Sequence, residues 1–235
     1  RGDDNVNNTP RQINMLKALG ATIPQYAHLS MILGDDGQKL SKRHGAVSVM
    51  QYDEDGYLPE AVLNYLARLG WSHGDDEIFS MQQFCEWFDL DHITPSAAQF
   101  NTEKLNWLNA HYIKQADLDR LAADAKKRLA SKGISTDGGP KLTEVIALYR
   151  DRANKLNELA NSIQYFYQLP ETDAAAAEKH LTPDVLPILQ AMLPQLEATD
   201  WTVEALHHVI EKTVVDNGLK FPKVAMPLRV MVTGG

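Results

Sequence analysis

From Pro59 onward, apolar residues recur at helical spacing over almost the whole chain. The first such segment begins at Pro59, which suits the first turn of a helix, and Gly70 can end it. Its apolar set is Ala61, Val62, Leu63, Leu66 and Leu69. The spacing therefore predicts one helix over this segment, with that set facing the core.

Polar residues and prolines predict where further helices begin. Thr9 before Pro10 suits an N-cap followed by the first helical residue, with Gly20 at the end of the helix. Ser80 with Gln83 is a capping-box pattern ahead of an aromatic-rich run. The other predicted starts are Asn101 or Thr102, Asp117, Thr182-Pro183, and Asp200 or Thr202. The helix that begins at Asp117 should end near Gly133, and the last helix near Gly218.

The remaining segments predict a loop, further helix and a short strand. Residues 135–140 form a Gly-rich loop and a candidate domain boundary, and residues 141–168 predict one long helix or two abutting ones. Pro187 should kink or break the helix that starts at Thr182-Pro183. The apolar run 28–33 predicts a short strand. The fold class is therefore mainly α, preceded by a small α/β segment.

Composition narrows the class of protein. A hydrophobic content of 44% in 235 residues is ordinary for a globular protein of about two compact units. No run has the length of a membrane span and no secretory signal is present, so we expect a cytoplasmic protein. The single Cys85 excludes an internal disulfide and a thiolate cluster, and its aromatic neighbours predict a buried thiol.

Charge does not by itself predict nucleic-acid binding, because the net charge is −8. Local basic patches decide such binding, and three groups of cations are candidates. They are Lys39 to Arg43, Lys126-Lys127-Arg128 with Lys132, and Lys220, Lys223 and Arg229. Each group alone is more typical of a solvated helix face or loop. The aromatic cluster 165–167 could stack on unpaired bases, although core packing is the commoner role.

The stretch Lys-Leu-Ser-Lys-Arg at 39–43 carries three cations on a Gly-containing loop that follows the predicted strand. Lysine supplies a compact charge and arginine a planar donor fork. Such a loop could close over a polyanion and neutralise the charge that develops on a phosphate chain under attack. Basic pentads are also common in solvated loops, so the pentad alone leaves both interpretations open.

Several motifs occur together in one order. They are Arg-Gly-Asp-Asp at 1–4, Asn-Thr-Pro at 8–10, the pentad at 39–43, Gly-Tyr-Leu-Pro-Glu-Ala at 56–61, Leu-Gly-Trp-Ser at 69–72, Phe-Asn-Thr-Glu-Lys-Leu at 100–105, Trp-Leu-Asn at 107–109, Met-Pro-Leu-Arg-Val at 226–230 and Thr-Gly at 233–234. In this order and spacing the chain resembles bacterial glutamyl-tRNA synthetase over essentially its whole length.

The resemblance implies a role for the pentad. The matching loop of the family closes on ATP, so Lys39, Leu40, Ser41 and Lys42 would bind ATP, and Lys42 and Arg43 would act in catalysis. Leu40 stands where Met is commoner, a change that conserves volume. Magnesium would accompany the ATP, no metal site is expected in the chain itself, and no cofactor should be tightly bound to it.

The resemblance also implies the remaining partners. Arg1 would reach the carboxylate of L-glutamate, although we expect it to be poorly placed at a chain end. Asn5 stands where His is frequent, and an imidazole contact to the nucleotide would be lost or altered. Arg229 would contact the anticodon of tRNA(Glu), or else hold the helices together. The protein is expected to be a monomer with no membrane contact.

The implied domains are the end of a class I catalytic domain at 1–50, a helical connecting domain at 51–138 and a truncated helical anticodon-binding domain at 139–235. The chain begins and ends inside motifs and lacks the His-Ile-Gly-His-type ATP signature. We therefore expect a fragment that does not make glutamyl-adenylate alone.

Three alternatives remain. A glutaminyl-specific relative usually carries β-barrel anticodon domains, and the helical signals here speak against it. A shortened paralogue that glutamylates a modified tRNA base should lack an anticodon domain, whereas this chain retains most of one. In a non-catalytic binding module, the pentad would be only a charged turn.

Overall fold

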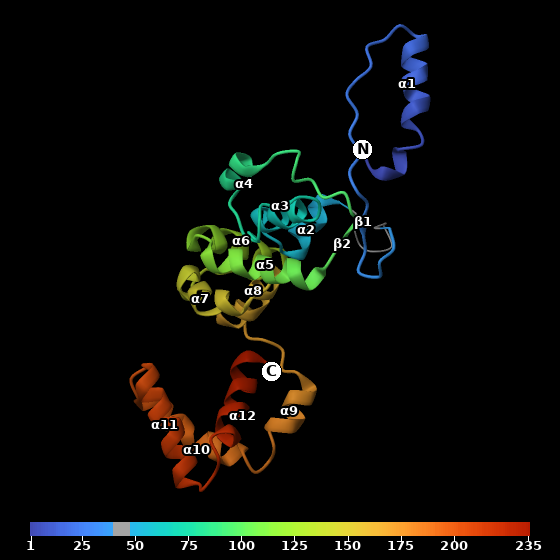
Figure 1. The fold of residues 1–235 in the computed structure, drawn as a ribbon. Helices are drawn as coiled ribbons and strands as arrows, with labels where there is room; N and C mark the ends of the chain where they lie inside the picture. The colour runs from blue at the N-terminus through green and yellow to red at the C-terminus, as the bar shows by residue number, and fades with distance from the viewer. Residues whose placement is uncertain (40–47) are drawn as a thin grey trace. The chain divides into compact units, whose positions relative to one another are not determined.

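The structure is a computed structural model that describes residues 1–39 and 48–235 (Figure 1). The chain forms two compact units. Unit 1 comprises residues 1–128 and 142–161, and unit 2 comprises residues 129–141 and 162–235. Over the described ranges the chain is mainly helical, with a two-stranded parallel sheet, so the predicted fold class is confirmed.

Unit 1 begins with its small α/β part. The 3-10 turn η1 (Asp3–Asn5) and helix α1 (Thr9–Ala18) precede strand β1 (Ile32–Leu33). Strand β1 pairs in parallel with β2 (Ala98–Gln99), so that Ile32 lies opposite Ala98 and Leu33 opposite Gln99. The predicted strand is therefore present but short. It matters because it carries the chain directly into the basic pentad.

The rest of unit 1 is helical. Its elements are α2 (Val49–Asp55), α3 (Pro59–Arg68), α4 (Met81–Trp87), α5 (Thr102–Gln115), α6 (Leu118–Ser131), α7 (Leu142–Tyr149), η3 (Arg150–Arg152) and α8 (Leu156–Ile163). Helices α6 and α8 each run on into unit 2 by a few residues. The segment predicted as one long helix or two abutting ones is thus two helices, α7 and α8, separated by a 3-10 turn.

The core of unit 1 forms where α3 packs on α5. Its buried members are Tyr57, Val62, Tyr65, Leu69, Leu105 and Leu108. The predicted apolar face of α3 is partly wrong, since Leu63 and Leu66 are 48% and 36% exposed. Tyr65 takes the buried place instead, because Val62, Tyr65 and Leu69 follow the stripe that faces α5.

Local capping chemistry sets several helix starts. Ser80 and Gln83 form the predicted capping box, and Asn101 and Thr202 cap the helices that follow them. The N-cap predicted at Thr9 is wrong by one residue. Asn8 occupies that place, and the Thr9 hydroxyl donates to the Asn5 carbonyl at 3.0 Å.

Unit 2 contains the last helices of the chain, together with the 3-10 turn η4 (Gln164–Phe166). The helices are α9 (Ala174–His180), α10 (Leu186–Ala198), α11 (Val203–Asp216) and α12 (Pro222–Thr233). Their buried apolar cluster consists of Val185, Leu189, Met192, Val209 and Val224. The helix start predicted at Thr182-Pro183 is wrong. Helix α10 begins at Leu186, and Pro187 lies in its first turn, where a missing N–H is tolerated.

Cys85 corrects another prediction, because its side chain is exposed. Phe84 and Phe88 both pack on Trp71 from one side of α4. Cys85 is rotated by about 100° from Phe84 around the helix and so leaves that face. In the described part of the chain, no helix is both long and apolar enough to cross a membrane.

Candidate functional site

A tight hairpin places the first residue of the basic pentad. The Gly34 amide donates to the Gln38 carbonyl at 2.7 Å, and Gly37 turns the chain with a φ of +74°. Leu33 and Lys39 then face each other in an antiparallel bridge. The structure thus fixes Lys39 at the end of β1. Leu40, Ser41, Lys42 and Arg43 lie outside the described residues.

Lys39 forms an ion pair with Asp4, with 2.9 Å between the ammonium nitrogen and a carboxylate oxygen. The hydrogen bond from Lys39 is the main reason that the pKa of Asp4 lies below its usual range, and the lysine charge adds to it. Both side chains are about half exposed. Such a pair contributes little to stability and can exchange partners easily.

Arg1 is placed by neutral acceptors, contrary to the expected poor placement at a chain end. Its guanidinium donates to the Asn5 side-chain oxygen at 3.0 Å and also reaches Thr9 and Gln12. The main chain is held as well, since the Leu29 amide donates to the Arg1 carbonyl at 2.7 Å. None of these three side-chain acceptors carries a charge, so they leave the positive charge of Arg1 uncompensated.

Asn5 links the two cations of this region. Its oxygen accepts from Arg1, and its amide nitrogen donates to Asp4 at 2.9 Å. Asp4 in turn accepts from Lys39. We call Arg1, Asp4, Asn5 and Lys39 the N-terminal polar cluster. Two cations and one anion on an exposed face suit the binding of a carboxylate or a phosphate.

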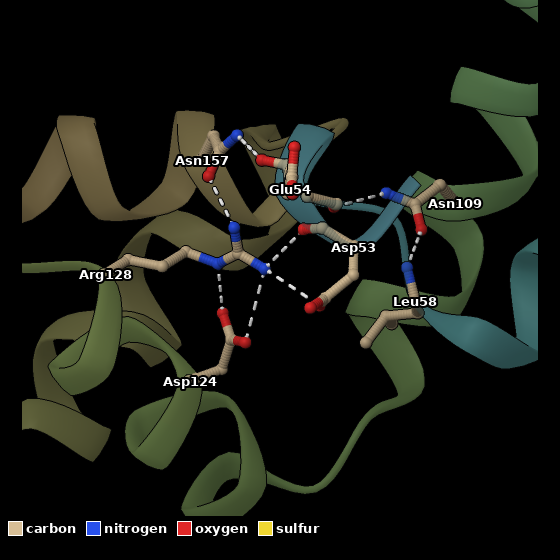
Figure 2. Close-up of polar contacts among 8 residues, drawn as sticks. Asp53, Glu54, Leu58, Asn109, Asp124, Arg128 and Asn157 are labelled. Atoms are coloured by element: carbon tan, nitrogen blue, oxygen red, sulfur yellow. Dashed lines mark hydrogen bonds and ion pairs between the residues drawn. The ribbon is translucent and has the colours of Figure 1, made fainter. Parts of the chain in front are cut away.

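A second polar network anchors α2, the helix that follows directly after residues 40–47 (Figure 2). The Arg128 guanidinium donates to Asp124 and to the Asn157 side chain, each at 2.6 Å, and to the Asp53 carbonyl at 3.0 Å. Its side chain is only 14% exposed. Arg128 is therefore wrong as a candidate phosphate contact, because its donors are used inside unit 1.

Asn109 completes this network from α5 (Figure 2). Its oxygen accepts from the Leu58 amide at 2.8 Å, and its nitrogen donates to the carbonyls of Asn154 and Gly56, at 2.6 and 3.3 Å. The side chain is fully buried. Gly56 is required here, because its φ is +91° and a Cβ would lie 2.7 Å from the Asn157 amide nitrogen.

Sequence reasoning missed Asn109, although a signal existed. Asn109 lies four residues after Leu105 on the same stripe of an apolar helix face, and a polar residue in such a place usually has buried partners. The network joins the end of α2 to α5, α6 and α8. It therefore holds α2, the first helix after the pentad, in place within unit 1.

Arg229 and the aromatic cluster 165–167, two of the features predicted to contact RNA, lie in unit 2. Arg229 is exposed on α12, and its carbonyl accepts from the Thr233 hydroxyl at 2.8 Å. Tyr165 and Phe166 are half-buried and stack on each other with ring centroids 4.3 Å apart. The Tyr167 hydroxyl donates to the Pro140 carbonyl. Within the described ranges, no group of three or more His, Cys, Asp or Glu side chains could hold a metal ion.

Comparison with known families agrees with this layout. Residues 1–107 match the family described as tRNA synthetases class I (E and Q), catalytic domain. Residues 96–235 match the family described as anticodon binding domain. The first match contains the N-terminal polar cluster and the pentad, and the second contains unit 2.

Among curated proteins, the chain is similar to glutamate–tRNA ligases from Methylobacillus flagellatus (74% identical), Azoarcus sp. (64%) and Dechloromonas aromatica (61%). Each alignment covers 100% of this chain and 50% of the relative. The chain therefore spans about half the length of the curated relatives it matches.

Solved structures give the same result. A glutamate tRNA ligase from Elizabethkingia meningosepticum, crystallised with its amino acid, matches with a TM-score of 0.80 at 30% identity. A glutamate–tRNA synthetase from Elizabethkingia anophelis matches with a TM-score of 0.76 at 30% identity. Each match covers 100% of this chain and 50% of the solved one. The resemblance seen in the sequence motifs is confirmed.

Proposed function

The chain belongs to the glutamate–tRNA ligase family, and we propose that the whole protein containing it activates glutamate with ATP and transfers the glutamyl group to tRNA(Glu). The observation that carries this proposal is 74% identity over the full chain to a glutamate–tRNA ligase. Because the chain spans about half of that relative, its residues supply only part of the machinery. In this proposal the protein is a cytoplasmic monomer.

In this proposal, the pentad closes over the triphosphate. Lys42 stabilises the pyrophosphate as it leaves, and Arg43 and Lys39 add positive charge where the negative charge develops. The structure supports a role for Lys39, since it stands at the end of a hairpin and pairs with an exposed carboxylate. A phosphate oxygen could replace Asp4 at small cost, because an exposed ion pair contributes little to stability.

Arg1 is proposed to bind the carboxylate of glutamate. Its guanidinium is oriented by Asn5, Thr9 and Gln12, which are neutral acceptors. A carboxylate could therefore pair with a charge that the protein has positioned but not neutralised. Asn5, standing where the family often has His, would then act by orienting Arg1 rather than by touching the nucleotide.

The helical parts are proposed to bind tRNA. Residues 51–138 would contact the stem, and residues 139–235 would contact the anticodon, with Arg229 reaching a base or a phosphate. Magnesium would travel with ATP. The described residues contain no group of acids that would hold it, so we derive no step through the metal.

The test uses the full-length protein with the substitution Lys42→Gln. Glutamate-dependent pyrophosphate exchange should fall by about two to three orders of magnitude, the effect of removing one group that stabilises transition-state charge. The dissociation constant for tRNA(Glu) should stay unchanged. Lys17→Gln, an exposed lysine on α1, is the matched control and should alter neither quantity.

Two results would contradict the proposal. Unchanged exchange in Lys42→Gln would make the pentad a charged turn, as expected of a non-catalytic binding module. A loss of tRNA affinity that equals the loss of exchange would assign the pentad to RNA rather than to ATP.

A further inference from the structure

A groove in unit 2 gathers positive side chains from two helices that are far apart in the sequence. Its volume is ≈ 370 Å³. Its lining includes Lys179, His180, Thr182, Lys220, Lys223 and Met226. About forty residues separate the two pairs of basic side chains. Only the fold brings these basic side chains together. The sequence pattern indicated Lys220 and Lys223 but not Lys179 and His180.

The antiparallel contact of α9 and α12 creates this groove. At one end, the Asp173 amide donates to the Gly234 carbonyl at 2.8 Å, which ties the start of α9 to the end of α12. At the other end, the last turn of α9 meets the first turn of α12. Lys179 and His180 belong to that last turn, and Lys223 belongs to that first turn. The cations converge because both helices carry them at the ends that meet.

The groove keeps a net positive charge. In the described part of the chain, no salt bridge engages any of the three lysines, and Lys179, Lys220 and Lys223 are all exposed. Among the described residues, no Asp or Glu lines the groove, which carries three lysines. Outside the lining, the pKa of Asp184 is lowered first by a hydrogen bond from Thr182, and Lys223 makes a smaller contribution. The lining is therefore basic in a protein whose net charge is −8.

The chemistry of the lining selects a phosphate rather than a base. Three lysines provide point charges without the planar fork that reads a base edge. No Phe, Tyr or Trp lines the groove to stack on a base. The first amides of α12 are already used, since Lys223 and Val224 donate to the carbonyls of Lys220 and Phe221. A ligand would therefore be held by side chains, with the N-terminal dipole of α12 favouring an anion.

We propose that this groove binds a phosphodiester of the tRNA backbone without reading its sequence, an inference that rests on the proposed function. The groove also has a defined relation to Arg229. Met226 lines the groove, and Arg229 follows three residues later on the same stripe of α12. A phosphate held in the groove fixes the register of the RNA strand along α12, so that Arg229 can reach the neighbouring nucleotide.

The experiment measures binding of the 235-residue chain to a tRNA(Glu) transcript and to an unrelated tRNA across a salt series. Lys220→Gln and Lys223→Gln should each weaken binding several-fold at low salt. The slope of log K against log salt should become shallower by about 0.7 to 0.9 for each lost phosphate contact. Both tRNAs should lose affinity by the same factor, because the contact carries no sequence information.

Lys212→Gln is the matched control, an exposed lysine on α11 outside the groove, and it should leave affinity and slope unchanged. Lys223→Arg should keep the slope, because the charge is retained. Thermal unfolding of each variant identifies any that fails to fold, and the other glutamine variant then provides the test.

Three results would overturn the inference. Unchanged slopes in both glutamine variants, with normal binding by the parent chain, would refute the groove but leave the proposed function intact. An equal loss in Lys212→Gln would mean that overall charge, not the groove, binds the RNA. No binding of either tRNA by the parent chain would refute the groove and the RNA-binding part of the proposed function together.

Discussion

The two units hold their helices in different ways. In unit 1, buried polar side chains connect segments that lie far apart in the sequence: Asn109 holds Leu58 and Asn154, and Arg128 holds the Asp53 carbonyl. In helices α10 to α12 of unit 2, side-chain hydrogen bonds stay within one helix or its cap, as between Thr213 and Val209. A buried apolar cluster joins those helices to one another.

This difference has a physical consequence. A buried polar group must find its partners, so the network of unit 1 specifies one arrangement of α2, α5, α6 and α8. Apolar burial is non-directional and tolerates small shifts between helices. Unit 1 is therefore built to hold the segment next to the pentad in place, whereas unit 2 presents its polar side chains outward.

The substitution Asn109→Ala should have the largest effect of the changes that test this difference between the units. It leaves the Leu58 amide and the Asn154 carbonyl without their Asn109 partner, at about 1–3 kcal/mol for each unsatisfied group, whereas the Gly56 carbonyl still accepts from the Leu156 amide at 2.8 Å. We expect a loss of about 4 kcal/mol in the free energy of unfolding of unit 1. Urea unfolding followed by tryptophan fluorescence measures it. In a Trp201→Phe background, the remaining tryptophans all belong to unit 1.

Gln82→Ala is the control for this measurement, because Gln82 also belongs to unit 1. Gln82 donates to the Glu86 carboxylate within its own helix α4, so its loss should cost less than about 1 kcal/mol. If Asn109→Ala cost no more than this control, the network would not hold unit 1 together.

In unit 2, the equivalent test removes apolar volume. Met192 is 1% exposed, and Met192→Ala should destabilise α10 to α12 by about 3 kcal/mol through lost burial and a cavity. Hydrogen exchange should show lower protection in α10 to α12 and no change in unit 1. Leu193→Ala, at a position 55% exposed, should have little effect. Equal loss of protection in both units would show that they unfold as one body.

The smallest of the three effects should come from Arg128→Lys. Lysine keeps the charge, but one ammonium group cannot reach Asp124, Asn157 and the Asp53 carbonyl together. We expect a loss of about 2 kcal/mol in the unfolding of unit 1, measured in the same Trp201→Phe background. The adjacent exposed residue gives the control Lys127→Ala, which should stay within about 0.5 kcal/mol. If Arg128→Lys lost no more stability than Lys127→Ala, Arg128 would stabilise unit 1 through its charge alone.

Features that depend on short-range chemistry were predictable from the sequence. The caps at Ser80, Asn101 and Thr202 each bond an amide three residues ahead, so the deciding atoms lie next to one another in the chain. The motif order that identified the family is likewise a property of the sequence alone. The roles of Lys42 and Arg43 remain predictions, because both residues lie outside the described ranges.

The tertiary structure decided which apolar side chains are buried and which cations are paired with other side chains. Leu63 and Cys85 are as apolar as their buried neighbours, but the position of α5 and of the Trp71 cluster determines which helix face is covered. Arg128 and Lys223 both occur in basic runs, yet Arg128 turns inward to Asp124 and Asn157 while Lys223 lines an open groove.

The sequence by itself thus determined the family, the helical class and most of the helix starts that it predicted, because these follow from motif order and from contacts within one turn of helix. Only the tertiary structure decided that Asn109 joins α5 to two distant segments, and that Lys179 lines the same groove as Lys223. The physical reason is that each of these contacts depends on how two helices pack. Helix packing is set by the combined surfaces of both partners, which no single segment of the sequence contains.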